Sequence, residues 1–177
     1  YLKGTLLSLS NDFVGRGLRL QITDRRLSPE RRRMIEQKFM KWAGVIKLRH
    51  KLWRMRMAKI TDGETFLKAF ANKSRQVKHP VLLDFQVIEC DRISSQHLTS
   101  YTPKAAGSIN EVDGVRFDNY EQPLEYHVLH SHPGGGSWLS DPSHWDGSTE
   151  GDWVDANFII HWFGQDRGWL RGCPGRG

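Results

Sequence analysis

The apolar pattern changes from a helical spacing to a strand spacing along the chain, and this change limits the fold more than any other feature. From about residue 35 to residue 60, apolar side chains recur every three or four positions, as on one side of a helix. After Asp62-Gly63, short apolar runs bounded by turn residues follow one another. Helices first and strands later favour an α+β fold, with the early helices packed on a mainly antiparallel sheet, over a repeating βαβ sheet.

Two helices are predicted in the first third of the chain. The first begins after Ser28, because a serine caps free backbone N–H groups and the following Pro29 suits the first turn. It should end near Ala43, where Gly44 interrupts it. A second helix should cover residues 45 to 60 and bury two apolar sides.

The strand predictions rest on alternating or continuous apolar runs between turn residues. They cover residues 18 to 22, 64 to 70, 80 to 88, 114 to 118, 123 to 131 and 157 to 163. The strands at 64 to 70 and 80 to 88 are predicted to pair as a hairpin. A turn over residues 118 to 122 joins the next pair, and the Gly-, Ser-, Asp- and Pro-rich residues 133 to 151 predict a long loop.

Length and composition suit one domain over residues 1–177. With 38% apolar residues in 177, the chain can fill a single core. Apolar runs stay well short of a membrane span, and two cysteines are too few for a disulfide framework. The chain opens on Tyr1 and closes on Gly175-Arg176-Gly177, which favours reading it as a fragment of a larger protein.

Positive charge is concentrated early in the chain. Residues 16 to 59 carry 15 Lys and Arg against 3 acids, whereas the other residues carry 11 cations and 17 acids. Clustered cations suit contact with nucleic acid or an acidic protein surface. Lys47, Lys51 and Arg54 form a stripe at i, i+4 and i+7 of the second helix, and we interpret it either as a DNA or subunit contact or as a solvated side.

Two histidines near the end of a predicted strand offer the only metal-site hypothesis. His130 and His132 fall on the same side of an extended strand, and His144, Asp141 or Asp146 could complete a zinc site. The pattern resembles the JAMM metalloprotease signature, with Glu64, Glu89 or Glu111 as candidate general bases. Its spacing departs from that signature, however, and the alternative is a set of polar positions on a half-exposed strand.

A second resemblance covers nearly the whole chain and depends on the order of several separate segments. The segments are residues 11 to 22, Trp42-Ala43, Asp62 to Leu67, Glu89-Cys90-Asp91-Arg92-Ile93, Gly114 to Asp118 leading to Tyr126-His127, and Asn157 to Phe163 followed by Gln165-Asp166-Arg167 and Leu170-Arg171-Gly172-Cys173-Pro174. In this order they resemble the lambda family of phage portal proteins. The Cys- and Asp-rich insertion that many members carry after the Trp-Ala pair is missing here.

This resemblance implies a structural protein rather than an enzyme, without catalytic, cofactor-binding or metal-binding residues. Portal proteins form rings, usually dodecamers, at one capsid vertex, where DNA enters during packaging and leaves at infection. Expected partners are other copies of the chain, the terminase, capsid or scaffold proteins, head-completion proteins and double-stranded DNA, with no membrane. The residues match the wing region, so that stem, clip and crown are absent. Expected locations are the virion and, during assembly, the host cytoplasm, with a prophage as an alternative source.

Overall fold

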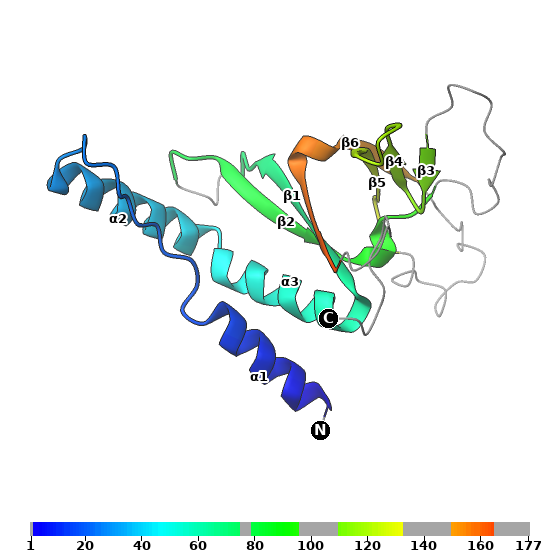
Figure 1. The fold of residues 1–177 in the computed structure, drawn as a ribbon, viewed down its shortest axis with the longest axis horizontal. Coiled ribbons are helices and arrows are strands. Elements are labelled where there is room, and N and C mark those ends of the chain that lie inside the picture. The colour runs from blue at the N-terminus through cyan, green and yellow to red at the C-terminus, as the bar shows by residue number, and fades with distance from the viewer. Residues whose placement is uncertain (1, 75–78, 96–109, 133–149, 165–177) are drawn as a thin grey trace.

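The computed structural model describes residues 2–74, 79–95, 110–132 and 150–164, and it shows helices followed by two antiparallel sheets (Figure 1). The α-helices within these residues are α1 (Leu2–Val14), α2 (Pro29–Val45) and α3 (Leu48–Asp62). One sheet has the strand order β2-β1-β7 and the other has the order β3-β4-β5-β6. The predicted α+β class is therefore confirmed.

The start of α2 follows from its sequence. The Ser28 hydroxyl accepts a hydrogen bond from the Arg31 N–H at 3.3 Å, and proline occupies the first turn, as predicted. Gly44 does not end the helix, which runs on to Val45. The break comes at Lys47, whose left-handed backbone (φ 53°) redirects the chain before α3 begins at Leu48.

One prediction for the N-terminal part is wrong, and one helix there was not predicted. Residues 18–22 form no strand, because their backbone lies beside α2 rather than beside another strand, and the Ile22 N–H donates to Glu36 Oε1 at 3.0 Å. The sequence does not predict helix α1, because Tyr1, which precedes it, is not a residue type that caps the start of a helix. This helix packs on α3, and its Phe13 ring lies 5.5 Å from the Trp162 ring, centroid to centroid.

The first sheet contains β1 (Glu64–Ala71), β2 (Leu83–Ile88) and β7 (Ile159–Phe163). Its central strand β1 pairs antiparallel with both neighbours, so the predicted hairpin is confirmed. Gly63, with φ 87°, ends α3 in the left-handed conformation and turns the chain directly into β1. Helix α3 lies between α1 and this sheet, which explains its two apolar sides (Figure 1).

The second sheet contains β3 (Asn110–Val112), β4 (Val115–Phe117), β5 (Pro123–Leu129) and β6 (Gly151–Asp155). Strand β6 begins in the segment predicted as a loop and pairs antiparallel with β5. The predicted strand at 157 to 163 starts later than expected, because residues 156–158 form a 3-10 turn. Asp155 caps that turn by accepting from the Asn157 N–H at 2.7 Å.

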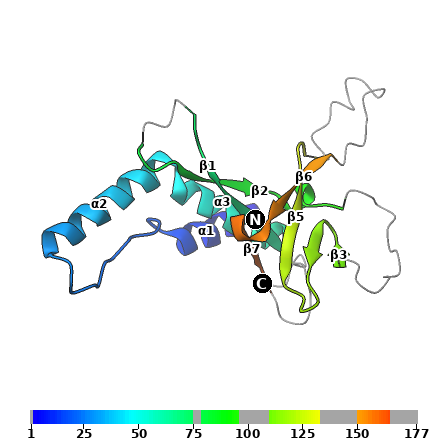
Figure 2. The ribbon, with the colours of Figure 1, turned by 90° about the horizontal axis from the view of Figure 1, so that it is seen from above.

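The main core lies between the two sheets, which cross near the middle of the molecule (Figure 2). Its fully buried members include Phe66 of β1, Ile88 of β2 and Tyr126 of β5. A smaller apolar cluster joins the helices to the first sheet through Trp42, Ile46 and Leu48, with Phe85 packed against them. Trp42 also donates its indole N–H to the Leu83 carbonyl at 2.8 Å.

Candidate functional site: a basic arm and an acidic sheet

The three predicted contact residues lie at the start and along the length of α3, but they do not form one free stripe. Lys47 is exposed in the break before α3. Lys51 is half-buried and its ammonium pairs with the Asp84 carboxylate of β2. Arg54 is exposed and lies 3.8 Å from Glu89. The structure therefore commits Lys51 to an internal ion pair and leaves Lys47 and Arg54 accessible.

Asp84 is the centre of a polar network that fixes α3 on β2. Its carboxylate accepts from Lys51, from the Asn72 amide at 2.8 Å and from the Phe85 N–H at 2.7 Å. Burial alone would raise the pKa of this carboxyl, but these hydrogen bonds outweigh burial, and its pKa is lowered. The network therefore holds a charged aspartate in a nearly buried position.

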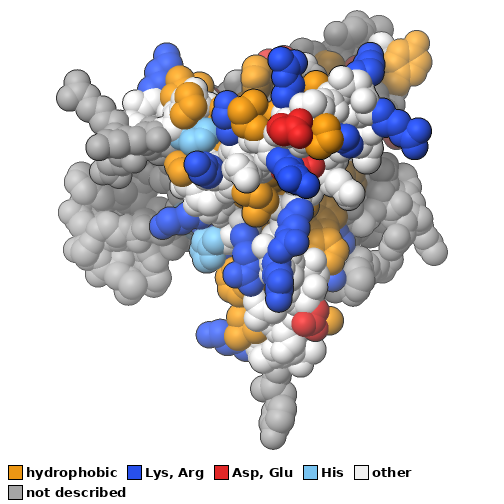
Figure 3. Space-filling model, turned by 90° about the vertical axis from the view of Figure 1, so that its left-hand side faces the viewer, with side chains coloured by type: hydrophobic (Ala, Val, Ile, Leu, Met, Phe, Trp, Pro, Cys, Tyr) orange, Lys and Arg blue, Asp and Glu red, His pale blue; other side chains and the backbone are white. Residues whose placement is uncertain are grey.

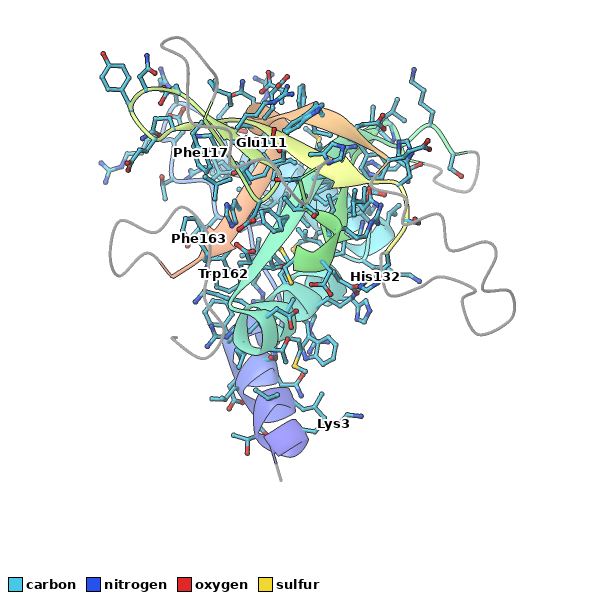
Figure 4. All side chains as sticks on the ribbon, turned by 90° about the vertical axis from the view of Figure 1, so that its right-hand side faces the viewer. Lys3, Glu111, Phe117, His132, Trp162 and Phe163 are labelled. Atoms are coloured by element: carbon cyan, nitrogen blue, oxygen red, sulfur yellow. The ribbon has the colours of Figure 1, made fainter. Side chains whose placement is uncertain are left out.

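The two histidines of the metal hypothesis contact separate carboxylates. His130 Nε2 lies 3.2 Å from Asp152. His132, which is labelled in Figure 4, has its Nε2 3.2 Å from Glu89 and 3.7 Å from Asp91. The further proposed ligands His144, Asp141 and Asp146 lie outside the described residues. Within the residues that the structure describes, no group of three or more His, Cys, Asp or Glu side chains could hold a metal ion.

A buried polar cluster that sequence reasoning missed connects the two sheets. His161 of β7 lies between the rings of Phe66 and Phe163, each 4.2 Å away between centroids. Its Nε2 is 2.9 Å from Glu64 Oε2, and its Nδ1 is 3.4 Å from the Tyr126 hydroxyl. Both Glu64 and His161 are almost fully buried, so this cluster serves packing between strands rather than a substrate. A histidine within the apolar run 159–163 was its only sequence signal.

Cys90 is a packing thiol, partly buried against the main core. Its burial, followed by the hydrogen bond to the Asp91 carboxylate, raises the pKa of the thiol to about 12. A thiol with such a pKa stays protonated at neutral pH and is a poor nucleophile. Cys173 lies outside the described residues.

The most prominent surface feature is a basic arm, which we define as residues 16–45. It comprises an extended segment and α2, and it reaches well beyond the sheets (Figure 2). The arm carries nine cations against three acids, and Lys and Arg side chains spread over its end of the molecule (Figure 3). Large apolar side chains are exposed among them, namely Leu18, Leu20, Met34, Ile35, Met40 and Val45.

The second sheet is acidic, in contrast to the arm. Residues 110–132 and 150–155, which we call the acidic sheet, carry eight acids against the cation Arg116. Arg116 pairs with Glu125 at 2.8 Å, lies 3.9 Å from Glu111, and stacks 3.5 Å from the centre of the Trp153 ring. The exposed acids of this sheet therefore exceed what its own arginine can neutralise.

An α+β block with charged and apolar surfaces, and with its buried polar groups used for packing, is typical of a subunit in a larger assembly. The chain matches the phage portal proteins of the lambda family over residues 1–175 and belongs to that family. None of the curated proteins compared with the chain matches it. The family consists of structural virion proteins, and membership implies an oligomeric ring at the portal vertex, in contact with capsid and DNA.

Among the described residues, none of the helices combines the length and the apolar character needed to cross a bilayer.

Proposed function

We propose that this chain is a structural subunit of the portal ring through which phage DNA is packaged into the capsid and ejected from it. The family match over residues 1–175 carries this proposal. In that ring, the α+β block takes the place of the wing, outside the central channel. The proposal includes no chemistry, because a wing needs a stable core and contacts with neighbouring subunits but no active site.

The described polar groups support a structural role. Glu64 and His161 pair inside the core, and Cys90 keeps its proton at neutral pH. The zinc-peptidase alternative has no supporting observation among the described residues, where the two strand-end histidines contact different carboxylates. We therefore propose partners of the portal type: other copies in a dodecameric ring, terminase, capsid or scaffold, head-completion proteins and double-stranded DNA.

The test is whether the full-length protein forms closed rings. Purified protein would be examined by negative-stain electron microscopy and by mass photometry, which counts the copies in each particle. Rings of one uniform copy number with an open centre are expected. A protein that stays monomeric over the whole concentration range, or that binds stoichiometric zinc and cleaves peptide bonds, would contradict the proposal.

We further propose that Lys47 and Arg54 contact a neighbouring subunit or DNA, while Lys51 primarily holds α3 on β2. Reversing Lys47 and Arg54 together should lower ring yield or packaging without changing the melting temperature, because both are exposed. Reversing Lys51 should instead lower the melting temperature, because it leaves Asp84 without its cation. If the Lys47→Glu/Arg54→Glu variant forms rings and packages DNA as the wild type does, these two residues do not make the proposed contact.

A further inference from the structure

We propose that the basic arm of one copy docks on the acidic sheet of a second copy, so that subunits join head to tail. The inference rests on the proposed ring function and names the surfaces that make its interface. It commits to another copy of this chain as the partner of the arm.

The two surfaces carry nearly equal and opposite charge. The arm holds nine cations and three acids, a balance of +6, and the acidic sheet holds eight acids and one cation, a balance of −7. Such complementarity steers association and fixes which surfaces meet. It also opposes the symmetric alternative, because two arms brought together, or two acidic sheets, would repel each other.

Two of the three carboxylates of the arm already have partners within it. Asp24 pairs with Arg26 at 2.9 Å, and Glu36 accepts the Ile22 N–H. The exposed cations Arg31, Arg33 and Lys38 of α2 form no ion pair with any carboxylate in the part of the chain that the structure describes. Their charge is therefore available to a partner that supplies acids.

The arm offers apolar contact between its cations. Met34, Ile35 and Met40 are exposed on α2, with 38% to 47% of each residue accessible. The extended segment covers only one side of this helix, where Arg32, Glu36 and Phe39 are half-buried. A partner that buries these apolar side chains gains hydrophobic stabilisation, which a purely electrostatic contact would lack.

The acidic sheet supplies the matching features. Glu111, Arg116, Glu125 and Asp155 stand in register across four strands and form a row of three acids around one arginine. Exposed apolar side chains accompany them, and Tyr120 in the turn between β4 and β5 is 84% accessible. Acids with a neighbouring aromatic anchor suit a basic, partly apolar helix.

The arm and the acidic sheet lie at opposite ends of the molecule, with the helices and the first sheet between them (Figures 1 and 2). The arm of one copy therefore reaches the acidic sheet of another copy and not its own. Contacts between two different surfaces repeat from copy to copy, and they close into a ring when the rotation per subunit allows it. If nucleic acid were the partner of the arm instead, only the charge of the arm would be explained, because the acidic sheet would have no partner.

The test reverses charges on each of the two surfaces in the full-length protein. The arm variant is Arg31→Glu/Arg33→Glu, and the sheet variant is Glu111→Lys/Glu121→Lys, which keeps the Arg116–Glu125 pair intact. The combined variant carries all four changes and lowers the balances to +2 on the arm and −3 on the sheet. Lys3→Glu/Lys73→Glu is the matched control, because it removes as much positive charge from exposed positions outside the arm. Ring yield is measured by mass photometry, and folding by circular dichroism.

Each single-surface variant should need about tenfold more protein to assemble, equivalent to about 1.4 kcal/mol. The combined variant has the weakest charge complementarity and should need more protein than either of them. The control should assemble as the wild type does, and wild-type assembly should weaken from about 50 mM to about 500 mM NaCl because salt screens the contact. Full assembly of both single-surface variants, or of the combined variant, would overturn the inference while leaving the ring itself in place.

Two other results are also decisive. An arm variant that forms normal rings but loses binding to a labelled DNA duplex would make the arm a nucleic-acid surface and overturn the inference. A wild-type chain that never assembles would overturn both this inference and the proposed function.

Discussion

Asp84 shows how a single charged residue can stabilise a fold from a nearly buried position. Its pair with Lys51 joins a helix to a strand that is 33 residues away in sequence. Removing one partner of such a pair leaves the other charge poorly solvated. Lys51→Met should therefore lower the free energy of unfolding by about 3 kcal/mol, measured by urea titration with tryptophan fluorescence.

A double variant distinguishes the ion pair from simple packing. Lys51→Met/Asp84→Asn removes both charges while keeping hydrogen-bonding atoms at position 84, so it should be more stable than Lys51→Met alone. If the single and double variants unfold at the same urea concentration, the charge of Asp84 makes no contribution and the explanation is wrong.

The lowered pKa of Asp84 also predicts a pH dependence. A carboxyl whose pKa is lower in the folded state stabilises the fold fully above its unfolded value, here taken as 3.8. That contribution is lost as the pH falls below 3.8 and through the folded pKa. The wild type should lose more stability than Asp84→Asn between about pH 5 and pH 3, measured by urea unfolding. Parallel losses in both proteins would contradict this assignment.

At the scale of elements, the turn between β3 and β4 depends on Gly114. Its φ is 79°, and an added Cβ would lie 2.6 to 2.7 Å from the backbone of Ser94. Gly114→Ala should therefore destabilise the protein by roughly 2–4 kcal/mol, because both the backbone conformation and the contact become strained. Gly44→Ala is the control: it has open space at its Cβ position inside α2 and should be neutral or slightly stabilising. Equal melting temperatures for the two variants would argue against a strained turn.

The elements also show what sequence patterns can and cannot predict. The Ser28-Pro29 start of α2 and the β1–β2 hairpin were predictable, because capping and strand pairing between neighbours are local effects. Residues 18–22 alternate like a strand but lie beside a helix, since tertiary contacts decide what an extended segment pairs with. The Glu64–His161 pair joins residues 97 positions apart, which no local pattern reveals. The stripe at Lys47, Lys51 and Arg54 looked uniform in sequence, yet Asp84 neutralises its middle member.

At the scale of the whole molecule, Trp42 connects the basic arm to the sheets. Its indole N–H donates to the Leu83 carbonyl, and its ring packs with Phe39 and Phe85. Trp42→Phe should increase hydrogen exchange in α2 while leaving β1 and β5 protected, because the arm loses a tie to the first sheet. Trp53→Phe is the matched control, since the Trp53 indole N–H has no hydrogen-bond partner among the described residues. Unchanged exchange in α2 of the Trp42→Phe protein would show that the arm is held in another way.

The order of strands in the first sheet has a consequence for biosynthesis. Strand β1 pairs with β7, and Glu64 is opposite Phe163, so the sheet cannot be completed until almost all of these residues have left the ribosome. Until then Phe66, fully buried in the finished protein, lacks the His161 ring that covers it. Such late pairing slows folding and leaves aggregation-prone apolar surface exposed on the nascent chain. Slower translation upstream of residue 159 should therefore lower the soluble yield unless a chaperone shields β1 in the meantime.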